Sequence, residues 1–549
     1  MTEEGDQLRH PIVTSLQKNP FEIQRYSHWV KQQLDKNTID PIKLIGQFLF
    51  DYNNSDFKFK AVPKNKSAID QFVEIIKTAK LELDKSFDGL SATSLDSLKT
   101  DLPVLAEKFS ESIYIQNEKN SQQLDKNLNT ISLIQKIRPR HSAQGFAILS
   151  NQIDLIFLEQ IRSEAKFLLN KNQRKQVRIK TSLGDIIVSG SGIDTYTFKP
   201  EDKIFLIIDL DGDDIYQNAN SIIIDYNGND IYESSENWIS SGSVMGIQFI
   251  MDLQGDDRYT GLQGSFASTL FGISFLLDKN GNDEYRCIKY CFATGFGGTA
   301  ILIDERGDDR YESLQLSQGV GIAGGYGLML DLAGNDSYYS KGNRPSGYGD
   351  AGQFDGWSQG IGVGLRGFVS GGLGLLYDRQ GQDVFDSGDF SQGGGYYFGW
   401  GLLINSGNEN DKYIGSRYSQ GFTAHYAIGT FLEAGGNDQY ISKHIVGQGM
   451  SWDLGITLFQ DFSGDDNYKT CPHCLGAASQ SGFTFFIDSA GKDTYKGISL
   501  PAAEKNPNDY HSGISLGFFM DQGNSADSYE VFKNNSEMIK PNYQILIDQ

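Results

Sequence analysis

The chain has 549 residues, with 48 Lys and Arg against 70 Asp and Glu, which gives a formal net charge of −22 at pH 7. A charge of this sign and size repels nucleic acid, so we expect no nucleic-acid partner. Four cysteines are too few for a disulfide framework, and the lack of any run of 18 apolar residues predicts that the chain does not span a membrane.

The charge is divided unevenly along the chain. Residues 1–180 hold 27 basic and 22 acidic residues, whereas residues 181–549 hold 21 and 48. Most of the 62 glycines and 27 tyrosines also lie in the second part. We therefore predict an α-helical N-terminal domain over 1–180 and an acidic, Gly- and Tyr-rich repeat domain over 181–549.

Helical patterns fill the first domain. Candidate helix starts stand at Asn19-Pro20, Asp40-Pro41 and Ser67, and Glu22 is placed to complete a capping box with Asn19. Further helical patterns cover about 94–116, 120–138 and 146–169. We expect a bundle that covers the first coil of the repeat domain, with partner binding or targeting as the alternative.

The ends of this first domain bear on location and binding. The N-terminus lacks the basic and apolar regions of a signal peptide. We favour a secreted or cell-surface protein that leaves by a signal-independent route, with a cytoplasmic location or a removed signal as alternatives. Residues 171–180 form a basic stretch that could meet anionic lipid or polysaccharide, although a solvated helix end explains such a run equally simply.

From about residue 181 the motif Asp-x-x-Gly-(Asp/Asn)-Asp-x-Tyr recurs about every 27 residues. Each repeat joins an apolar run, the Asp turn, a short Tyr-bearing strand and a Gly-rich return. A fixed period of this size is typical of a repeat protein. We predict a mainly β fold, a parallel β-solenoid or β-helix of about 12 coils. The alternative, a closed propeller of hairpins, would need a longer period.

Stacked coils place identical positions above one another. The Tyr column should become an aromatic ladder, and the Gln of the recurring Ser-Gln-Gly, as at Gln318, Gln359, Gln392 and Gln420, should become an amide ladder. The sixth motif position is Asp in all thirteen copies, including the looser ones at Asp194, Asp411 and Asp527. Neighbouring carboxylates ~4.8 Å apart repel by roughly 0.9 kcal/mol in water and by more where solvent is excluded.

Two arrangements could stabilise such an acidic column. Calcium could lie between coils, because it accepts six to eight oxygen ligands in loose geometry. Alternatively each Asp caps its own turn and no metal is needed. Alternating Asn at the fifth position, as at Asn229 and Asn282, dilutes the charge. The candidate metal ligands are Asp209, Asp214, Asp225, Asp230, Asp252, Asp257, Asp278, Asp283, Asp304, Asp309, Asp331, Asp336, Asp378, Asp383, Asp438, Asp461, Asp466, Asp488 and Asp493.

Two turns show a family resemblance. The segments Gly435-Gly-Asn-Asp-Gln-Tyr440 and Ala333-Gly-Asn-Asp-Ser-Tyr338 resemble the Gly-Gly-x-Gly-x-Asp turn of RTX calcium-binding repeats. That resemblance implies calcium between the coils of a β-roll and secretion without an N-terminal signal. RTX turns recur every nine residues, whereas these recur about every 27, so the resemblance covers the turn alone.

Interruptions of the period are candidate binding sites, because solenoids carry function on inserted loops. One insertion, Tyr339 to Trp357, is a possible ligand loop, and Pro501 to Tyr510 is a second insertion. The first loop could form a carbohydrate site, or it could be a plain surface loop without a ligand. Its candidate ligand residues are Arg344, Tyr348, Asp350, Asp355 and Trp357.

The cysteines form two local sets, Cys287 with Cys291 and Cys471 with Cys474. The sets stand about seven repeats apart, so they cannot share one zinc ion. Each set could be a local disulfide, a strained pair of thiols or buried small side chains, and the sequence does not decide between these roles.

Three functions remain compatible with these features. We favour a non-enzymatic, calcium-associated β-solenoid that acts as a surface, secreted or scaffold and adhesion protein with a protein or polysaccharide partner, or that self-assembles. The second is a β-helix enzyme that acts on polysaccharide through a carboxylate pair or calcium. The third is an intracellular protein-interaction scaffold.

Overall fold

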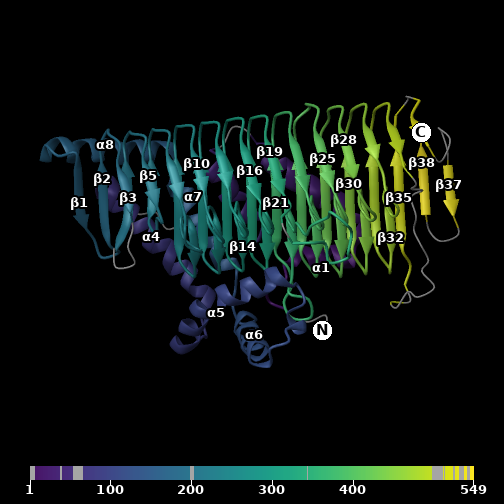
Figure 1. The fold of residues 1–549 in the computed structure, drawn as a ribbon, viewed down its shortest axis with the longest axis horizontal. Coiled ribbons are helices and arrows are strands. Elements are labelled where there is room, and N and C mark those ends of the chain that lie inside the picture. The colour runs from purple at the N-terminus through teal and green to yellow at the C-terminus, as the bar shows by residue number, and fades with distance from the viewer. Residues whose placement is uncertain are drawn as a thin grey trace. The chain divides into compact units, whose positions relative to one another are not determined.

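The computed structural model describes residues 6–36, 40–53, 66–197, 203–342, 344–497, 511, 513–523, 526–530, 537–540 and 544–548. The second predicted insertion, Pro501 to Tyr510, lies outside these residues. The chain forms a parallel β-solenoid of about 11 turns with a helical N-terminal region, which confirms the predicted fold class (Figure 1). It divides into two compact units, residues 32–309 and residues 1–31 with 310–549.

The described residues contain eight α-helices, none of which is both long and apolar enough to cross a membrane. Asp40 and Ser67 cap helices as predicted: their side chains accept the N–H groups of Ile42 (3.0 Å) and Asp70 (3.1 Å). The helices are α1 (Pro11–Lys18), α2 (Ile23–Leu34), α3 (Pro41–Tyr52), α4 (Ala68–Asp84), α5 (Ala92–Glu111), α6 (Ser121–Ile134), α7 (Arg140–Gln152) and α8 (Leu155–Asn172).

Two helix predictions were wrong in detail. The Asn19 side chain makes no capping bond, and Pro20–Glu22 forms a 3-10 turn before α2. The single pattern over 146–169 is two helices, because α7 ends at Gln152 and Asp154 starts α8 by accepting the Phe157 N–H at 2.8 Å. A helical period continues across such a break, so periodicity alone does not locate it.

In the unit of residues 32–309, the coils contribute strands to three sheets, and the third sheet begins only with the third coil. The first sheet contains β2 (Asp185–Ser189), β4 (Ile204–Asp209), β6 (Ile222–Asp225), β9 (Ile247–Asp252), β12 (Ile273–Asp278) and β15 (Thr299–Asp304), with β1 (Gln176–Lys180) antiparallel to β2. The second contains β3 (Thr195–Thr197), β5 (Ile215–Gln217), β7 (Ile231–Glu233), β10 (Arg258–Thr260) and β13 (Glu284–Arg286). The third contains β8 (Gly242–Val244), β11 (Ser268–Leu270) and β14 (Thr294–Phe296).

The unit of residues 1–31 and 310–549 repeats the same plan. Its first sheet contains β18 (Tyr326–Asp331), β21 (Leu373–Asp378), β24 (Trp400–Asn405), β27 (Ile428–Glu433), β30 (Ile456–Asp461), β33 (Phe483–Asp488), β35 (Leu516–Asp521) and β38 (Gln544–Asp548), with β37 (Glu537–Lys540) antiparallel to β38. Its second contains β16 (Arg310–Ser313), β19 (Ser337–Ser340), β22 (Val384–Ser387), β25 (Lys412–Gly415), β28 (Gln439–Ser442), β31 (Asn467–Lys469), β34 (Thr494–Lys496) and β36 (Ser528–Tyr529). Its third contains β17 (Val320–Ile322), β20 (Ile361–Val363), β23 (Gly394–Tyr396), β26 (Phe422–Ala424), β29 (Met450–Trp452) and β32 (Ala477–Ser479).

The strand register places equal motif positions opposite one another. Asp225 pairs with Asp252 in the first sheet, and Tyr232 pairs with Tyr259 in the second. The tyrosine rings stack as predicted: successive centroids at Tyr232, Tyr259 and Tyr285 lie 4.7 Å apart, with the rings within 5° of parallel. The column therefore fixes each coil against the next one.

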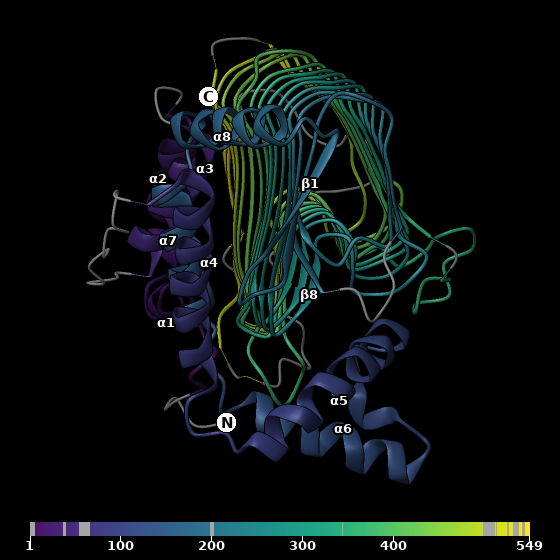
Figure 2. The same cartoon turned by 90° about the vertical axis from the view of Figure 1, so that its left-hand side faces the viewer.

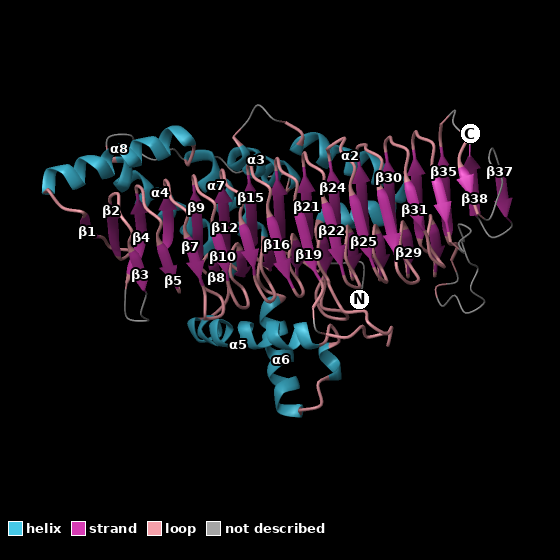
Figure 3. Cartoon of the chain, turned by 45° about the horizontal axis from the view of Figure 1, so that its top comes forward, coloured by secondary structure: helices cyan, strands magenta, loops and turns pink. Residues whose placement is uncertain are grey.

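Helices cover the outer face of the first sheet within each unit (Figure 3). In residues 32–309, the ring centroids of Phe146 (α7) and Phe275 lie 5.7 Å apart, and those of Phe72 (α4) and Phe249 lie 6.0 Å apart. Because both faces of this sheet are buried, its strands are continuous apolar runs rather than alternating ones. Whereas α8 contacts the starting strands β1 and β2, α7 contacts β12 and β15, so the helices do more than cover the first coil.

In the other unit, α1 and α2 have the same role. The α2 hydroxyl of Ser27 lies 3.0 Å from the Thr430 hydroxyl, and His28 Nε2 lies 2.8 Å from Gln460 Oε1. From α1, the Gln17 amide donates to the Tyr426 carbonyl at 2.6 Å. These are polar contacts to coils of this unit that are distant in sequence.

The glutamine column differs from the predicted amide ladder. The Gln420 amide donates to the carbonyl groups of Tyr413 and Ile441, at 3.0 and 3.1 Å, and Gln392 binds Phe385 and Ile414 in the same way. These glutamines lie in tight returns with positive φ, 67° at Gln392 and 55° at Gln420. Their side chains therefore tie a strained return to the neighbouring strands instead of pairing with one another.

Candidate metal centre in the stacked aspartate turns

The first Asp of each motif ends a first-sheet strand and points into the solenoid. Its Oδ2 accepts a hydrogen bond from the tyrosine hydroxyl of the preceding turn, as in Tyr259 to Asp278 (2.6 Å) and Tyr468 to Asp488 (2.7 Å). The sequence predicted the tyrosine stack but missed these hydroxyl contacts. The tyrosine of one coil thus positions the carboxylate of the next.

The second oxygen of several of these residues caps its own turn. Oδ1 of Asp225 accepts the Asn227 N–H at 3.0 Å, and Oδ1 of Asp252 accepts the Gln254 N–H at 3.1 Å. This is the Asx-turn geometry of the metal-free alternative. Turn capping therefore explains the contacts of these Oδ1 atoms without a metal ion.

The sixth Asp links one coil to the next through its backbone and side chain. The Asp230 N–H donates to Asp257 Oδ1, and the Asp257 N–H donates to Asp283 Oδ1, both at 2.5 Å. The other oxygen, Oδ2, is buried and has no hydrogen-bond partner among the described residues. This holds for Asp214, Asp230, Asp257, Asp283, Asp383, Asp466 and Asp493.

These two kinds of Asp converge in groups of three. Each triad joins the sixth Asp of one turn to the first and sixth Asp of the next turn, with ligand oxygens all within 4.8 Å of one another. In residues 32–309 the triads are Asp194–Asp209–Asp214, Asp214–Asp225–Asp230, Asp230–Asp252–Asp257, Asp257–Asp278–Asp283 and Asp283–Asp304–Asp309. A sixth-position Asp between two coils therefore belongs to two triads.

All nineteen candidate ligands are at most 2% exposed, including Asp331, Asp336, Asp378, Asp438, Asp461 and Asp488 in the unit that contains residues 310–549. Burial raises the pKa of Asp278 well above its usual value, and the nearby Asp283 carboxylate raises it further. Burial and the nearby Asp252 carboxylate likewise raise the pKa of Asp230. An uncompensated column of anions is therefore unfavourable, and a cation or protons must offset it.

The motif glycine allows the turns to approach this closely. A Cβ on Gly281 would lie 1.8 Å from the Gly255 carbonyl oxygen of the preceding turn and 2.6 Å from Asp283 Oδ1. Any larger residue would push the two coils apart. The glycine thus keeps successive carboxylates near enough to share one cation.

Two successive coils depart from the pattern together. Phe385 stands in the tyrosine column, and the next first-position residue is Asn405. The Asn405 amide donates to Asp411 Oδ2 at 2.9 Å, the oxygen that lacks a partner in most turns. Where the hydroxyl donor is missing, the buried carboxylate is replaced by a neutral group that itself supplies a donor.

The fifth position forms a separate, solvent-exposed ladder. The Asn229 N–H donates to Asp213 Oδ1 at 2.9 Å, and the Asp256 N–H donates to Asn229 Oδ1 at 2.8 Å. Alternating Asn and Asp here hydrogen-bond to the neighbouring turn and dilute the charge, as the sequence suggested. These residues lie outside the triads.

The inserted loop places its candidate ligand residues in separate contacts. Arg344 pairs with Asp355 at 3.0 Å, and Asp350 pairs with Arg417 at 2.8 Å. Trp357 is 2% exposed and stacks on Phe390 at 4.0 Å. Tyr348 is 50% exposed and lies over the Arg417 guanidinium at 4.4 Å. The charged groups thus form ion pairs within the protein, and Tyr348 is the most exposed of the five candidate residues.

The cysteines form two local pairs, Cys287 with Cys291 and Cys471 with Cys474, whose Cα atoms lie 6.4 and 5.4 Å apart. All four side chains are buried. Of the three roles that the sequence left open, the structure has the local disulfide in both sets.

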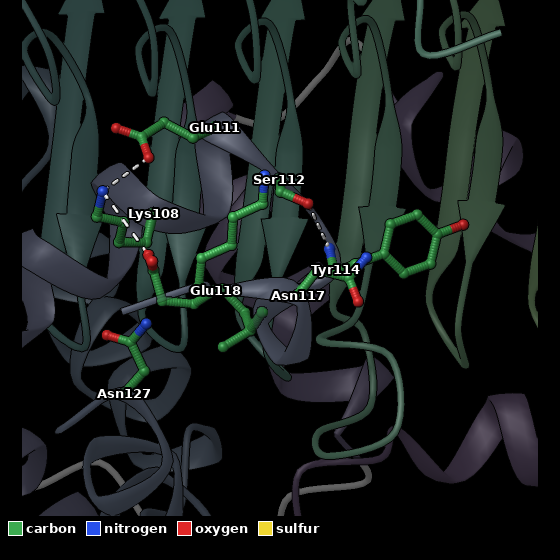
Figure 4. Close-up of a pocket in the computed structure, with 9 residues that line it drawn as sticks. Lys108, Glu111, Ser112, Tyr114, Asn117, Glu118 and Asn127 are labelled. Atoms are coloured by element: carbon green, nitrogen blue, oxygen red, sulfur yellow. Dashed lines mark hydrogen bonds and ion pairs between the residues drawn. The ribbon is translucent and has the colours of Figure 1, made fainter. Parts of the chain in front are cut away.

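A cavity of about 320 Å³ lies beside α5 and α6 (Figure 4). Two lysines line it: Lys108 contacts Glu111 at 2.8 Å and Glu118 at 3.9 Å, and Lys119 is exposed to solvent. Ser112 accepts the Tyr114 N–H at 3.1 Å. Its two lysines and two glutamates together give the lining no formal net charge.

No protein-family model, curated protein or solved structure matches this chain.

Proposed function

We propose that the protein is a non-enzymatic β-solenoid scaffold whose stacked aspartate turns bind calcium. The observation that carries this proposal is the buried, unpartnered Oδ2 of successive sixth-position residues such as Asp257 and Asp283. A buried carboxylate oxygen without a donor costs about 1–3 kcal/mol or more. A cation shared by the triad would satisfy these oxygens in every regular coil.

Charge balance supports one divalent cation per coil. Each added coil contributes a first and a sixth Asp to the column, which together carry two negative charges. One calcium ion offsets both, whereas one shared proton leaves a negative charge in every coil. At ~4.8 Å and an effective dielectric constant of ~20, adjacent charges repel by roughly 3–4 kcal/mol.

The ligand chemistry favours calcium over other ions. The triads offer only hard carboxylate oxygens, without the sulfur or imidazole ligands that zinc or copper prefer. Magnesium requires stricter octahedral geometry than a turn shared between coils provides. The similarity of the Gly435–Tyr440 turn to RTX repeats agrees with this choice of ion.

Burial of the acids supports a structural rather than a catalytic role. A carboxylate pair that hydrolyses polysaccharide must contact its substrate, and Asp257 and Asp278 are 2% and 0% exposed. We place the protein outside the cell, where its repeated surface would serve a protein or polysaccharide partner. Two local disulfides suit an oxidising compartment.

Thermal unfolding of the full chain, followed by circular dichroism, tests the proposal. Calcium at about 100 times its Kd should stabilise the fold by about 2.7 kcal/mol for each site, and excess chelator should reverse the effect. Magnesium should give a smaller increase in melting temperature. An unchanged melting temperature in chelator and in calcium would contradict the proposal and favour turn capping alone.

Two adjacent substitutions provide a matched comparison. Asp257→Asn alters two triads, so it should reduce the calcium-dependent stabilisation and the number of ions bound in a calorimetric titration. It should also stabilise the calcium-free protein, because it removes a buried charge. Asp256→Asn makes the same charge change in the exposed column and should leave calcium binding unchanged.

A further inference from the structure

A second cavity, of about 650 Å³, lies between the end of α8 and the first turns of the solenoid. Figure 2 shows α8 running next to β1 at this end of the unit. The cavity is lined by Arg162, Lys166, Arg174 and Lys175 and by Asp211 and Asn227 of the first turns. Its volume is in the range of small-molecule sites.

The local sequence brings these cations to one place. Arg162 and Lys166 are four residues apart on α8 and so share a helix face. Gln173 ends the helix with a φ of 49°, which turns the chain so that Arg174 and Lys175 follow at the same end. The Lys175 carbonyl accepts the Gly190 N–H at 3.0 Å, which fixes this segment to the first coil.

The charge of the cavity is largely uncompensated. In the part of the chain that the structure describes, Lys166, Arg174 and Lys175 make no ion pair. Asp211 is the one acidic lining residue, and its Oδ1 accepts the Asn227 amide at 2.7 Å. The cavity beside α5 and α6 differs, because two glutamates balance its two lysines.

Contacts with Tyr226 hold the Arg162 side chain in place at the cavity. Its guanidinium lies 5.2 Å from the Tyr226 ring centroid, and the Tyr226 hydroxyl donates to the Leu158 carbonyl at 2.6 Å. The Arg162 Nε is buried and has no partner among the described residues. The nearest carboxylate, Glu159, is 63% exposed and 3.5 Å away, so it neutralises Arg162 weakly.

We propose that this cavity binds a small anion that carries a phosphate or sulfate group, such as a phosphorylated or sulfated sugar. Four cations converge there, and guanidinium groups bind such oxyanions through paired N–H donors. The chain as a whole carries −22, so a long polyanion would be repelled while a compact one is held locally. The site is independent of the proposed calcium binding.

Isothermal titration of the full chain in calcium-free, low-salt buffer tests the site with three probes: inorganic phosphate, glucose 6-phosphate and glucose. Both phosphate compounds should bind detectably at ligand concentrations up to about 10 mM, and glucose should not bind. Tighter binding of glucose 6-phosphate than of inorganic phosphate would identify a phosphorylated sugar as the ligand class, and equal binding would identify the free oxyanion. No phosphate binding at about 10 mM would overturn the proposal.

A paired control separates the cavity from the general charge of the helix end. The double variant Arg174→Gln with Lys175→Gln should weaken phosphate binding by about tenfold or more. Lys171→Gln removes a neighbouring charge that does not line the cavity, so it should change the affinity by less than about twofold. If both variants lost the same phosphate affinity for each charge removed, the general charge of the helix end would explain the binding, and the proposed site would be refuted.

Discussion

At the level of single residues, the successive coils that contain Phe385 and Asn405 show what the aspartate column requires. The first-position carboxylates Asp278 and Asp378 each accept a hydrogen bond from the tyrosine hydroxyl of the preceding coil. When the ring at that place is Phe385, the first position of the next coil holds the neutral Asn405, whose amide donates to Asp411 Oδ2. The tyrosine hydroxyl is therefore a condition for a buried carboxylate, and not only part of an aromatic stack.

A double-mutant cycle at these positions measures this dependence. Asn405→Asp alone should destabilise the fold by about 1–3 kcal/mol, because it buries a carboxylate that lacks its donor. Adding Phe385→Tyr should recover most of that loss, with a coupling free energy of similar size. Phe385→Tyr alone should be nearly neutral. Urea unfolding of the four proteins in chelator provides the measurement.

The same cycle has a calcium arm. The double variant rebuilds the regular triad around Asp411, so it should bind one more calcium ion than the wild type in a calorimetric titration. Additive effects of the two substitutions, together with unchanged calcium binding, would show that the two departures from the pattern are unrelated.

At the level of elements, the sequence did not predict where α1 contacts the solenoid. The Asp40 and Ser67 caps were predictable because capping depends on neighbours in sequence. The positions of α1 and α2 on the sheet were not, because they depend on contacts such as Gln17 to Tyr426 across about 400 residues. No local pattern encodes such a pairing, and a helix that covers a sheet face resembles a terminal cap in its amphipathic pattern.

His10 should make the contact between α1 and the solenoid depend on pH. It is buried before α1, with Nε2 3.0 Å from the Gly324 carbonyl, and burial lowers its pKa to about 4. Below pH ~6.5 the unfolded chain binds a proton that the folded chain does not, so stability should fall as the pH drops from ~6.5 to ~4, by about 3 kcal/mol in total. Urea unfolding at pH 7 and pH 5 measures the loss.

His10→Gln provides the control, because an amide can also donate to the Gly324 carbonyl but does not titrate in this range. The variant should lose less stability than the wild type between pH 7 and pH 5. The same pH dependence in both proteins would mean that other groups are responsible.

At the level of the whole molecule, the sequence predicted the solenoid and the aromatic column because a repeated motif stacks on itself. It also identified the acidic residues, and all nineteen are buried in the column. It did not reveal the alternation of contacts within the column, in which Asp278 takes a tyrosine hydroxyl while Asp283 takes a backbone N–H from the preceding coil. Those partners come from adjacent coils, and only the stacking register brings them together.

The central claim is that a cation lies between successive aspartate turns. A crystal structure of the calcium-loaded protein, with anomalous differences measured at long wavelength, tests it most directly. We predict anomalous peaks in the regular triads, such as Asp257–Asp278–Asp283, at about 2.3–2.6 Å from the carboxylate oxygens, and no peak beside Asn405. Triads without peaks, in which the first and sixth carboxyl groups hydrogen-bond to each other, would contradict the claim and show that protons neutralise the column.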